Sequence, residues 1–232
     1  MLGSGPATVK ARWSDMRQGS VDDRNADSWL RPYLGLSSGT LGHLSSDGFL
    51  DWEIQPLFRP VRMVGPALTV ACQPTDNAPL AEAMSGAAPG TVMVVARYGD
   101  RRHAPWGGLM SRIAHGRGLA GTVIDGAATD WREIVELQYP VFARNLSALT
   151  TRRQNLPASV GEPVVCGGVL VRTGDVVIGD DDGVVVVPAQ RAEEYLAKAL
   201  RFEQWEHVFR TGLKEGLEPK VARARADEAV PR

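Results

Sequence analysis

Residues 121–144, GTVIDGAATDWREIVELQYPVFAR, carry the clearest indication of the fold class. Residues 121–125 are mostly apolar and predict a buried strand, and residues 140–144 predict a second one. Between them, residues 130–137 predict a short helix. A strand, a helix and a strand in this order form the unit from which parallel sheets are built.

The same alternation extends upstream and changes downstream. Strands are predicted at 66–72 and 91–96, and helices at 29–44, 78–86 and 106–115. After residue 144 the pattern becomes rich in strands, which are predicted at 163–167, 168–172, 175–179 and 183–188, before a last helix at 189–210. The sequence therefore predicts an α/β fold with a largely parallel central sheet, flanking helices and a β-rich C-terminal part. Its predicted organisation is an N-terminal arm at 1–30, one α/β domain at 31–212 that includes the terminal helix, and a flexible tail at 213–232.

Composition narrows the class of protein. The 232 residues are 44% hydrophobic and 23% charged, which is typical of globular domains, and the formal net charge is -1. This balance predicts neither a nucleic acid nor a membrane surface as partner, so a small molecule is the expected ligand. The N-terminus lacks the order of a signal peptide, and no stretch has the ~18 apolar residues of a membrane span. Cys72 and Cys166 form no paired motif. A cytoplasmic protein is predicted.

Two familiar motifs occur in the wrong context. Residues 116–121 have the letters of GxGxxG, but they follow a predicted helix and precede a strand, so they predict a helix end and turn and no dinucleotide site. Residues 180–183, Asp-Asp-Asp-Gly, follow a strand where a calcium loop needs its first ligands, and a hairpin turn is predicted there. The chain has no serine-hydrolase elbow, no HExxH and no P-loop.

Polar residues gather after two of the predicted strands. Asp125 and Asp130 follow the strand at 121–125 and are expected to reach the same sheet edge. The spacing of Asp130 and Glu133 predicts in the first place a capping box at the start of the helix at 130–137. Carboxylates also suit Mg²⁺ or Mn²⁺, which need only one or two of them, and the two roles are compatible. His103 lies in a polar run between a strand and the glycines that open the next helix, which is a usual place for ligand groups in such folds.

At this point the chain resembles a known family, the one that contains the regulator of ribonuclease E activity A and the class II pyruvate aldolases acting on 4-hydroxy-4-methyl-2-oxoglutarate. The resemblance runs from about residue 37 to residue 212. It is carried by VGPALTV (64–70), DNAPLAEAM (76–84), WGGLM (106–110), GLAGTVIDGAATD (118–130), PVFARNLSALTT (140–151) and GDVVIGDDDGVVVVP (174–188).

The resemblance implies a swivelling-domain-like β/β/α core, a homotrimer or a dimer of trimers, and sites at subunit interfaces. It implies that Asp130 is linked to a divalent metal, Mg²⁺ or Mn²⁺. An α-keto acid would lie against the helix start at Gly107, Gly108, Leu109 and Met110, beside Thr129, with the amides of Leu109 and Met110 receiving its carboxylate. A glutamate of the neighbouring subunit's last helix, Glu203 or Glu206, would complete the site, and Glu206 is taken here as the site residue.

The sequence departs from the aldolase pattern at two positions. Thr129 stands where the family has an arginine, and Gly108 where it often has an acid. Threonine cannot replace the charge or the fork of a guanidinium. The cations expected near strand ends are Arg101, Arg102 and Arg144, of which Arg102 is favoured.

The predicted function is that of a metal-dependent carbon–carbon lyase, which cleaves or decarboxylates an α-keto acid through an enolate stabilised by the metal. Its predicted catalytic residues are Arg102, His103, Asp130 and Glu206. Two alternatives stay open. One is a non-catalytic protein-binding member like the regulators, favoured by the loss of the arginine. The other is a different metal-assisted lyase or hydrolase reaction, with His103 or His43 as proton carrier.

Overall fold

Four parallel strands form the centre of the sheet, as the alternating pattern predicts. The structure is a computed structural model that describes residues 30–231. In it, β2 (Met63–Ala71) pairs with β3 (Val92–Ala96), β3 with β4 (Gly121–Ala128), and β4 with β5 (Val141–Leu146), all in parallel. The strands are almost fully buried on both faces, which is why their sequences are nearly continuous apolar runs.

Antiparallel strands extend this centre on both sides. They are β1 (Gln55–Pro56) beside β5, β6 (Ser159–Val160) beside β2, and the hairpin β9 (Val176–Asp180) and β10 (Gly183–Val187), which follows β2. The two ends of the sheet come together, where Arg59 Nε donates to the Asp181 carbonyl at 3.0 Å, so the sheet is nearly closed. The predicted hairpin turn at residues 180–183 is confirmed.

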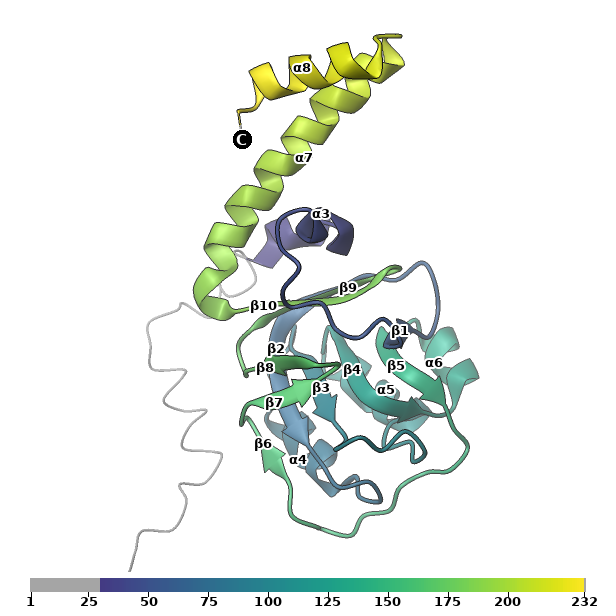
Figure 1. The fold of residues 1–232 in the computed structure, drawn as a ribbon. Coiled ribbons are helices and arrows are strands. Elements are labelled where there is room, and N and C mark those ends of the chain that lie inside the picture. The colour runs from purple at the N-terminus through teal and green to yellow at the C-terminus, as the bar shows by residue number, and fades with distance from the viewer. Residues whose placement is uncertain (1–29, 232) are drawn as a thin grey trace, which may run out of the picture.

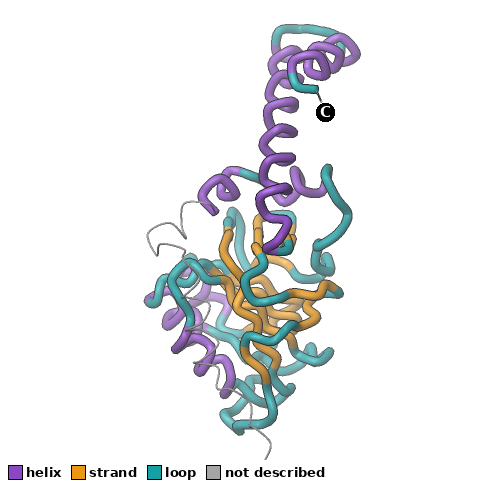
Figure 2. The backbone as a smooth tube through the Cα atoms, turned by 90° about the vertical axis from the view of Figure 1, so that its left-hand side faces the viewer, coloured by secondary structure: helices purple, strands orange, loops and turns teal. Residues whose placement is uncertain are grey.

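Different elements cover the two faces of the sheet (Figures 1 and 2). Helices α4 (Ala78–Gly86), α5 (Gly108–Gly116) and α6 (Trp131–Leu137) cover one face, where Leu80, Ile134 and Tyr139 are fully buried. The separate hairpin β7 (Val164–Cys166) and β8 (Val169–Val171) covers the other face and packs on Phe142 and Val94. Both cysteines are buried and unpaired. Because β3 and β4 are parallel and each is followed by a helix, the starts of α5 and α6 meet at the carboxyl edge of the sheet.

The last part of the chain forms an arm that projects from the body. After η2 (Ala189–Arg191), α7 (Ala192–Lys214) packs its first turns on β9 and β10, together with η1 (Arg31–Gly35) and α3 (Ser38–Gly42). The rest of α7 leads away from the sheet, and α8 (Pro219–Ala229) folds back along it (Figure 1).

A helix thus stands where the sequence predicted a flexible tail at 213–232. Its contact with α7 uses small residues, because Ala222 and Ala226 are fully buried and a Cβ on Gly212 would lie 3.1 Å from the Ala222 Cβ. Trp205 of α7 donates its indole N–H to Asp227 of α8 at 2.8 Å. On α7 the ring of Trp205 stacks on those of Phe202 and Phe209.

The N-terminus differs from expectation in a second way. The single helix predicted at 29–44 is divided into η1 and α3, where Ser37 caps the second of these by accepting the Thr40 N–H. The predicted arm at 1–30 lies outside the described residues except for Leu30. Within residues 30–231, no helix is long and apolar enough to cross a membrane.

The burial of Tyr33 leads us to expect that the protein loses stability at alkaline pH. Its side chain is fully buried and donates to the Ala192 carbonyl, and burial raises the pKa of Tyr33 to about 12. In the unfolded chain a tyrosine hydroxyl has a pKa of about 10. The stabilisation from burying the neutral Tyr33 is therefore complete below pH ~10 and is lost as the pH rises toward 12. We expect the free energy of unfolding to fall by about 2 kcal/mol more in the wild type than in Tyr33→Phe between these limits, measured by urea denaturation. Equal falls in the two proteins would contradict this assignment.

Candidate functional site

Two consecutive glycines begin helix α5, and the carboxylate of Asp130 lies against both. A Cβ on Gly107 would lie 2.4 Å from Asp130 Oδ2 and 2.7 Å from Thr129 Cγ2. The Gly108 N–H donates to the same Oδ2 at 3.0 Å. The end of β4 is held beside this loop by a bond of 2.9 Å from the Thr129 N–H to the Trp106 carbonyl. The structure therefore brings together Gly107, Gly108, Thr129 and Asp130, and glycine at 107 is what admits the carboxylate.

Asp130 does not cap helix α6, so the predicted capping box is wrong. Its backbone is left-handed, with φ 55 and ψ 40, and its side chain makes no bond to the first amides of α6. This conformation is uncommon outside glycine, although aspartate and asparagine tolerate it better than most residues. The carboxylate instead reaches the start of the neighbouring helix. A strained residue whose side chain leaves its own helix is typical of functional sites.

The remaining groups around Asp130 are open for a ligand. Its second oxygen, Oδ1, lies 3.4 Å from the Thr129 hydroxyl. Leu109 and Met110 are the next residues of the first turn of α5, and among residues 30–231 neither amide has a hydrogen-bond acceptor. Free amides at a helix N-terminus attract anions. The Leu109 side chain is 68% exposed, so this first turn faces solvent.

A salt bridge that the sequence analysis missed adjoins these groups. Arg112 of α5 donates through Nε and Nη2 to Glu133 Oε1, at 3.0 and 2.7 Å. Arg112 lies one turn after Gly108, and Glu133 lies in the first turn of α6. The signal for Arg112 was its spacing of four residues from Gly108, which places both on one face of the helix.

The donors present suit a metal that needs few protein ligands. Within the described part of the chain, no group of three or more His, Cys, Asp or Glu side chains could hold a metal ion. Mg²⁺ and Mn²⁺ keep several waters and can bind through one or two carboxylates, so Asp130 is the group of this site that could hold such an ion.

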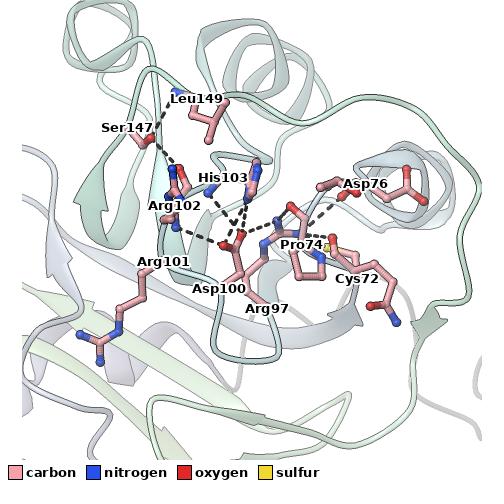
Figure 3. Close-up of polar contacts among 12 residues, drawn as sticks. Cys72, Pro74, Asp76, Arg97, Asp100, Arg101, Arg102, His103, Ser147 and Leu149 are labelled. Atoms are coloured by element: carbon pink, nitrogen blue, oxygen red, sulfur yellow. Dashed lines mark hydrogen bonds and ion pairs between the residues drawn. The ribbon is translucent and has the colours of Figure 1, made fainter.

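His103 is held in a fixed orientation by Asp100 (Figure 3). Its Nδ1 lies 3.2 Å from both carboxylate oxygens, and Asp100 also accepts the backbone N–H groups of Arg102 and His103. Burial by itself would raise the pKa of Asp100, but these hydrogen bonds outweigh it and lower the pKa. His103 stands four residues before Gly107 on the loop that enters α5, and a fixed imidazole on such a loop is suited to carrying protons.

Behind this pair lies a fully buried arginine, Arg97. It donates to Cys72 Sγ and the Gln73 carbonyl, both at 2.9 Å, and also to the Pro74 carbonyl. Burial raises the pKa of Cys72 despite the nearby guanidinium, so its thiol stays protonated and unreactive. Arg97 and Cys72 therefore hold the loop in place and are no candidates for chemistry.

Asp125 does not join Asp130, contrary to the expectation from the sequence. It forms an ion pair with Arg144 and accepts the Gly167 N–H at 2.8 Å, on the face covered by the β7–β8 hairpin. Arg144 also binds Asp51 and Glu53, each at 2.8 Å. Alternate residues of a strand point to opposite faces, and Ile124 packs beneath the helices, so Asp125 points away from them.

The arginines named from the sequence are not brought to Asp130. Arg144 is engaged as described, and Arg101 pairs with Glu53 at 2.8 Å and points away from His103 (Figure 3). Arg102 contributes its backbone N–H to Asp100 and its carbonyl to Ser147, while its exposed guanidinium makes no ion pair with any of residues 30–231. Arg112 is instead the cation beside the glycines.

Glu203 and Glu206, the two glutamates predicted to complete a neighbouring site, lie on α7. Glu203 accepts the Thr40 hydroxyl, and Glu206 pairs with Arg210 at 2.7 Å. Because this part of α7 leads away from the sheet (Figure 1), neither side chain contacts Asp130 within one chain. Their role in a neighbouring subunit stays a prediction.

A hollow of about 520 Å³ lies elsewhere, at the start of α4, where Glu82, Arg153 and Asn155 line it. Next to it, Asp76 accepts the amides of Ala78, Gln154 and Leu156 and is fully buried. These bonds close the loop over α4, so Asp76 has a structural role. The start of α5 is the stronger candidate because its polar groups are not satisfied in this way.

Comparisons with known proteins match the chain to one family. The family model described as "RraA-like: Aldolase/RraA" matches residues 39–186. A relative from Halalkalibacterium halodurans, named "Putative 4-hydroxy-4-methyl-2-oxoglutarate aldolase", is 38% identical over 146 residues, which are 63% of this chain and 69% of the relative.

Solved structures show the same fold. A crystal structure of an uncharacterized protein from Pseudomonas syringae pv. tomato has a TM-score of 0.75 and 30% identity, covering 85% of this chain and 98% of that one. Streptomyces coelicolor RraAS2, described as an unusual member of the RNase ES inhibitor RraA protein family, has a TM-score of 0.70 and 30% identity, covering 79% and 97%. The resemblance noted in the sequence is thereby confirmed: the chain belongs to the RraA-like (Aldolase/RraA) family.

Proposed function

We propose that this protein is a divalent-metal-dependent carbon–carbon lyase that cleaves an α-keto acid by retro-aldol reaction or decarboxylation. The observation that carries the proposal is the placement of Asp130. Its carboxylate leaves its own helix, lies over Gly107 and accepts the Gly108 N–H through Oδ2, while Oδ1 accepts only a long bond of 3.4 Å from the Thr129 hydroxyl among residues 30–231. An acid held in this way beside an anion-binding helix start is suited to a metal and an oxo-acid together.

The local charges also fit a metal. Arg112 pairs with Glu133, whereas Asp130 makes no ion pair with any of residues 30–231, so its uncompensated charge would repel an anionic substrate. A divalent cation on Asp130 reverses this sign and makes the site attractive to a carboxylate. When bound, such a cation supplies the positive charge that stabilises an enolate while the carbon–carbon bond breaks.

The chain's own groups then have separate tasks. Asp130 holds the cation, with Mg²⁺ or Mn²⁺ as the proposed ions, and the amides of Leu109 and Met110 receive the substrate carboxylate. Gly107 and Gly108 leave room for the carboxylates of Asp130 and Glu133 beside the helix start, and Thr129 lies against Gly107. His103, oriented by Asp100, is a proton-carrying side chain on the same loop. A site completed by Glu206 of a neighbouring subunit, in a trimer or dimer of trimers in the cytoplasm, remains part of the proposal, as does a supporting role for Arg102.

The experiment that tests this function measures pyruvate. Purified protein with Mn²⁺ is incubated with oxaloacetate and, separately, with 4-hydroxy-4-methyl-2-oxoglutarate, and pyruvate is assayed with lactate dehydrogenase. We expect release above the rate of Mn²⁺ alone from at least one substrate, and its loss with excess EDTA because the enolate charge is then uncompensated. Release no faster than with Mn²⁺ alone for both substrates would contradict the proposal.

A non-catalytic, protein-binding role is the second candidate, and Thr129 favours it. At this position the uncharged side chain offers no guanidinium to a carboxylate or enolate. Absence of pyruvate release together with no Mn²⁺-dependent rise in melting temperature would favour this role over the lyase.

A further inference from the structure

Glu133 occupies the volume that a side chain at residue 108 would fill. A Cβ on Gly108 would lie 2.0 Å from Glu133 Oε2, 2.4 Å from Cδ and 2.9 Å from Cβ. Gly108 has ordinary helical backbone, so the demand for glycine comes from this contact and not from its φ angle. The carboxylates of Asp130, just before α6, and of Glu133, in its first turn, therefore both contact Gly108.

The two oxygens of Glu133 have different surroundings. Arg112 donates two N–H groups to Oε1, which fixes the carboxylate across the gap between α5 and α6. No donor among residues 30–231 bonds to Oε2, which lies against Gly108 at the entrance to the first turn of α5. The Glu133 side chain is 37% exposed, so solvent reaches it. Arg112 thus holds one oxygen in place, while the other has no protein donor among the described residues.

This arrangement differs from an ordinary surface salt bridge in its position. An exposed Arg–Glu pair between two helices needs no glycine beneath it and gains little free energy. Here residue 108 is a glycine, and the Glu133 carboxylate fills the space of the missing side chain at the first residue of α5. The amides that receive the substrate carboxylate in the proposed function belong to Leu109 and Met110, the two residues after Gly108, so a substrate bound there would lie at the same helix turn as Oε2.

We propose that Glu133 is the side chain that moves a proton to and from the enolate carbon of the substrate, a step that both retro-aldol cleavage and decarboxylation require. This inference rests on the proposed function and assigns a group to it. With pyruvate as ligand, Glu133 takes a proton from the methyl carbon and the C–H electron pair becomes the enolate double bond. The return of a proton to that carbon restores pyruvate and the carboxylate, with no oxidation or reduction.

Exchange of pyruvate methyl hydrogens in D₂O isolates this step from bond cleavage. The protein with Mn²⁺ is mixed with pyruvate, and loss of the methyl proton signal is followed by NMR across the acid pH range. The variants are Glu133→Gln, which removes the acid–base group, and Gly108→Ala, whose Cβ displaces the carboxylate without deleting it. Glu136→Gln is the matched control, because Glu136 is an exposed acid of the same helix. His103→Gln tests the competing proton carrier.

We expect Glu133→Gln to slow exchange by about 100-fold or more and to lose the decrease in rate that protonation of a carboxylate causes at low pH. Gly108→Ala is expected to slow exchange toward the same value, and Glu136→Gln to leave it unchanged. The Mn²⁺-dependent rise in melting temperature is expected to stay in all three variants, because Asp130 is intact; this also shows that they fold.

Two results would overturn the assignment while leaving the lyase in place. One is a wild-type exchange rate and pH profile in Glu133→Gln, especially if His103→Gln abolishes exchange. The other is loss of the Mn²⁺ response in Glu133→Gln, which would make Glu133 a metal ligand instead of a proton carrier. If the wild type itself exchanges no hydrogen and releases no pyruvate, the proposed function fails and this inference fails with it.

Discussion

Replacing Asp130 by asparagine is expected to abolish both the Mn²⁺-dependent stabilisation of the protein and the release of pyruvate. At Mn²⁺ concentrations of 100 times Kd, binding to the native state stabilises a protein by about 2.7 kcal/mol. For a chain of this length, that corresponds to a rise in melting temperature of about 5–10 °C. Asparagine lacks the negative charge that holds the cation, so the rise should disappear when it is measured by differential scanning calorimetry.

Asparagine is the informative substitution because it preserves the local structure. It tolerates the left-handed backbone of residue 130, and its amide oxygen can still accept the Gly108 N–H. A change in metal response is therefore not a consequence of unfolding, which the melting temperature without metal verifies. Asp182→Asn is the control, since Asp182 is an exposed acid in the β9–β10 turn and should keep the full response. An undiminished response in Asp130→Asn would contradict the metal site.

Arg144→Met is expected to cause a large loss of stability, because this one side chain binds three carboxylates. The Arg144 side chain is only 8% exposed and binds Asp125, Asp51 and Glu53. Its removal leaves Asp125 with the Gly167 N–H as its one remaining protein donor among the described residues, in a partly buried position. Breaking a buried ion pair by removing one partner costs about 3–5 kcal/mol, because the other charge stays desolvated. We expect a decrease of that size in the free energy of unfolding from urea titration.

The neighbouring arginine provides the comparison. Arg101 pairs with the same Glu53 but is 54% exposed, and an exposed pair contributes about 0–1 kcal/mol. Arg101→Met should therefore change stability little. Equal losses in the two variants would show that the Arg144 network is not the desolvated cluster described here. The Arg144 network joins β4, β5 and the β7–β8 hairpin, so its loss should act on the fold and not on metal binding.

Much of the fold follows from the sequence because buried parallel strands leave a strong signal. The runs at 91–96 and 121–125 are mostly apolar and became β3 and the first part of β4. Helix α8 left no such signal, since Ala222 and Ala226 pack on Gly212 and small residues make no apolar stripe. The nearly closed sheet also depends on pairing between β2 and β9, which are far apart in sequence. Local patterns carry no information on such pairing.

The candidate site was predictable in its composition but not in its geometry. The order strand, glycines, helix placed Gly107, Gly108 and Asp130 at one sheet edge, and the structure brings them together. The capping box failed because the left-handed backbone of Asp130 turns its side chain toward α5. Asp125 points to the face opposite the helices because side chains alternate along β4, whereas the order of elements alone predicts only the edge of the sheet. The Arg112–Glu133 pair spans two helices whose relative placement only the folded structure supplies.

The most direct test of the metal-dependent site is a crystal structure of the protein with Mn²⁺ and oxalate, an analogue of the pyruvate enolate. We expect Mn²⁺ on Asp130 Oδ1, and an oxalate carboxylate within hydrogen-bonding distance of the amides of Leu109 and Met110. A structure at saturating Mn²⁺ in which Asp130 bonds only to the Gly108 N–H, with oxalate absent from the start of α5, would contradict it.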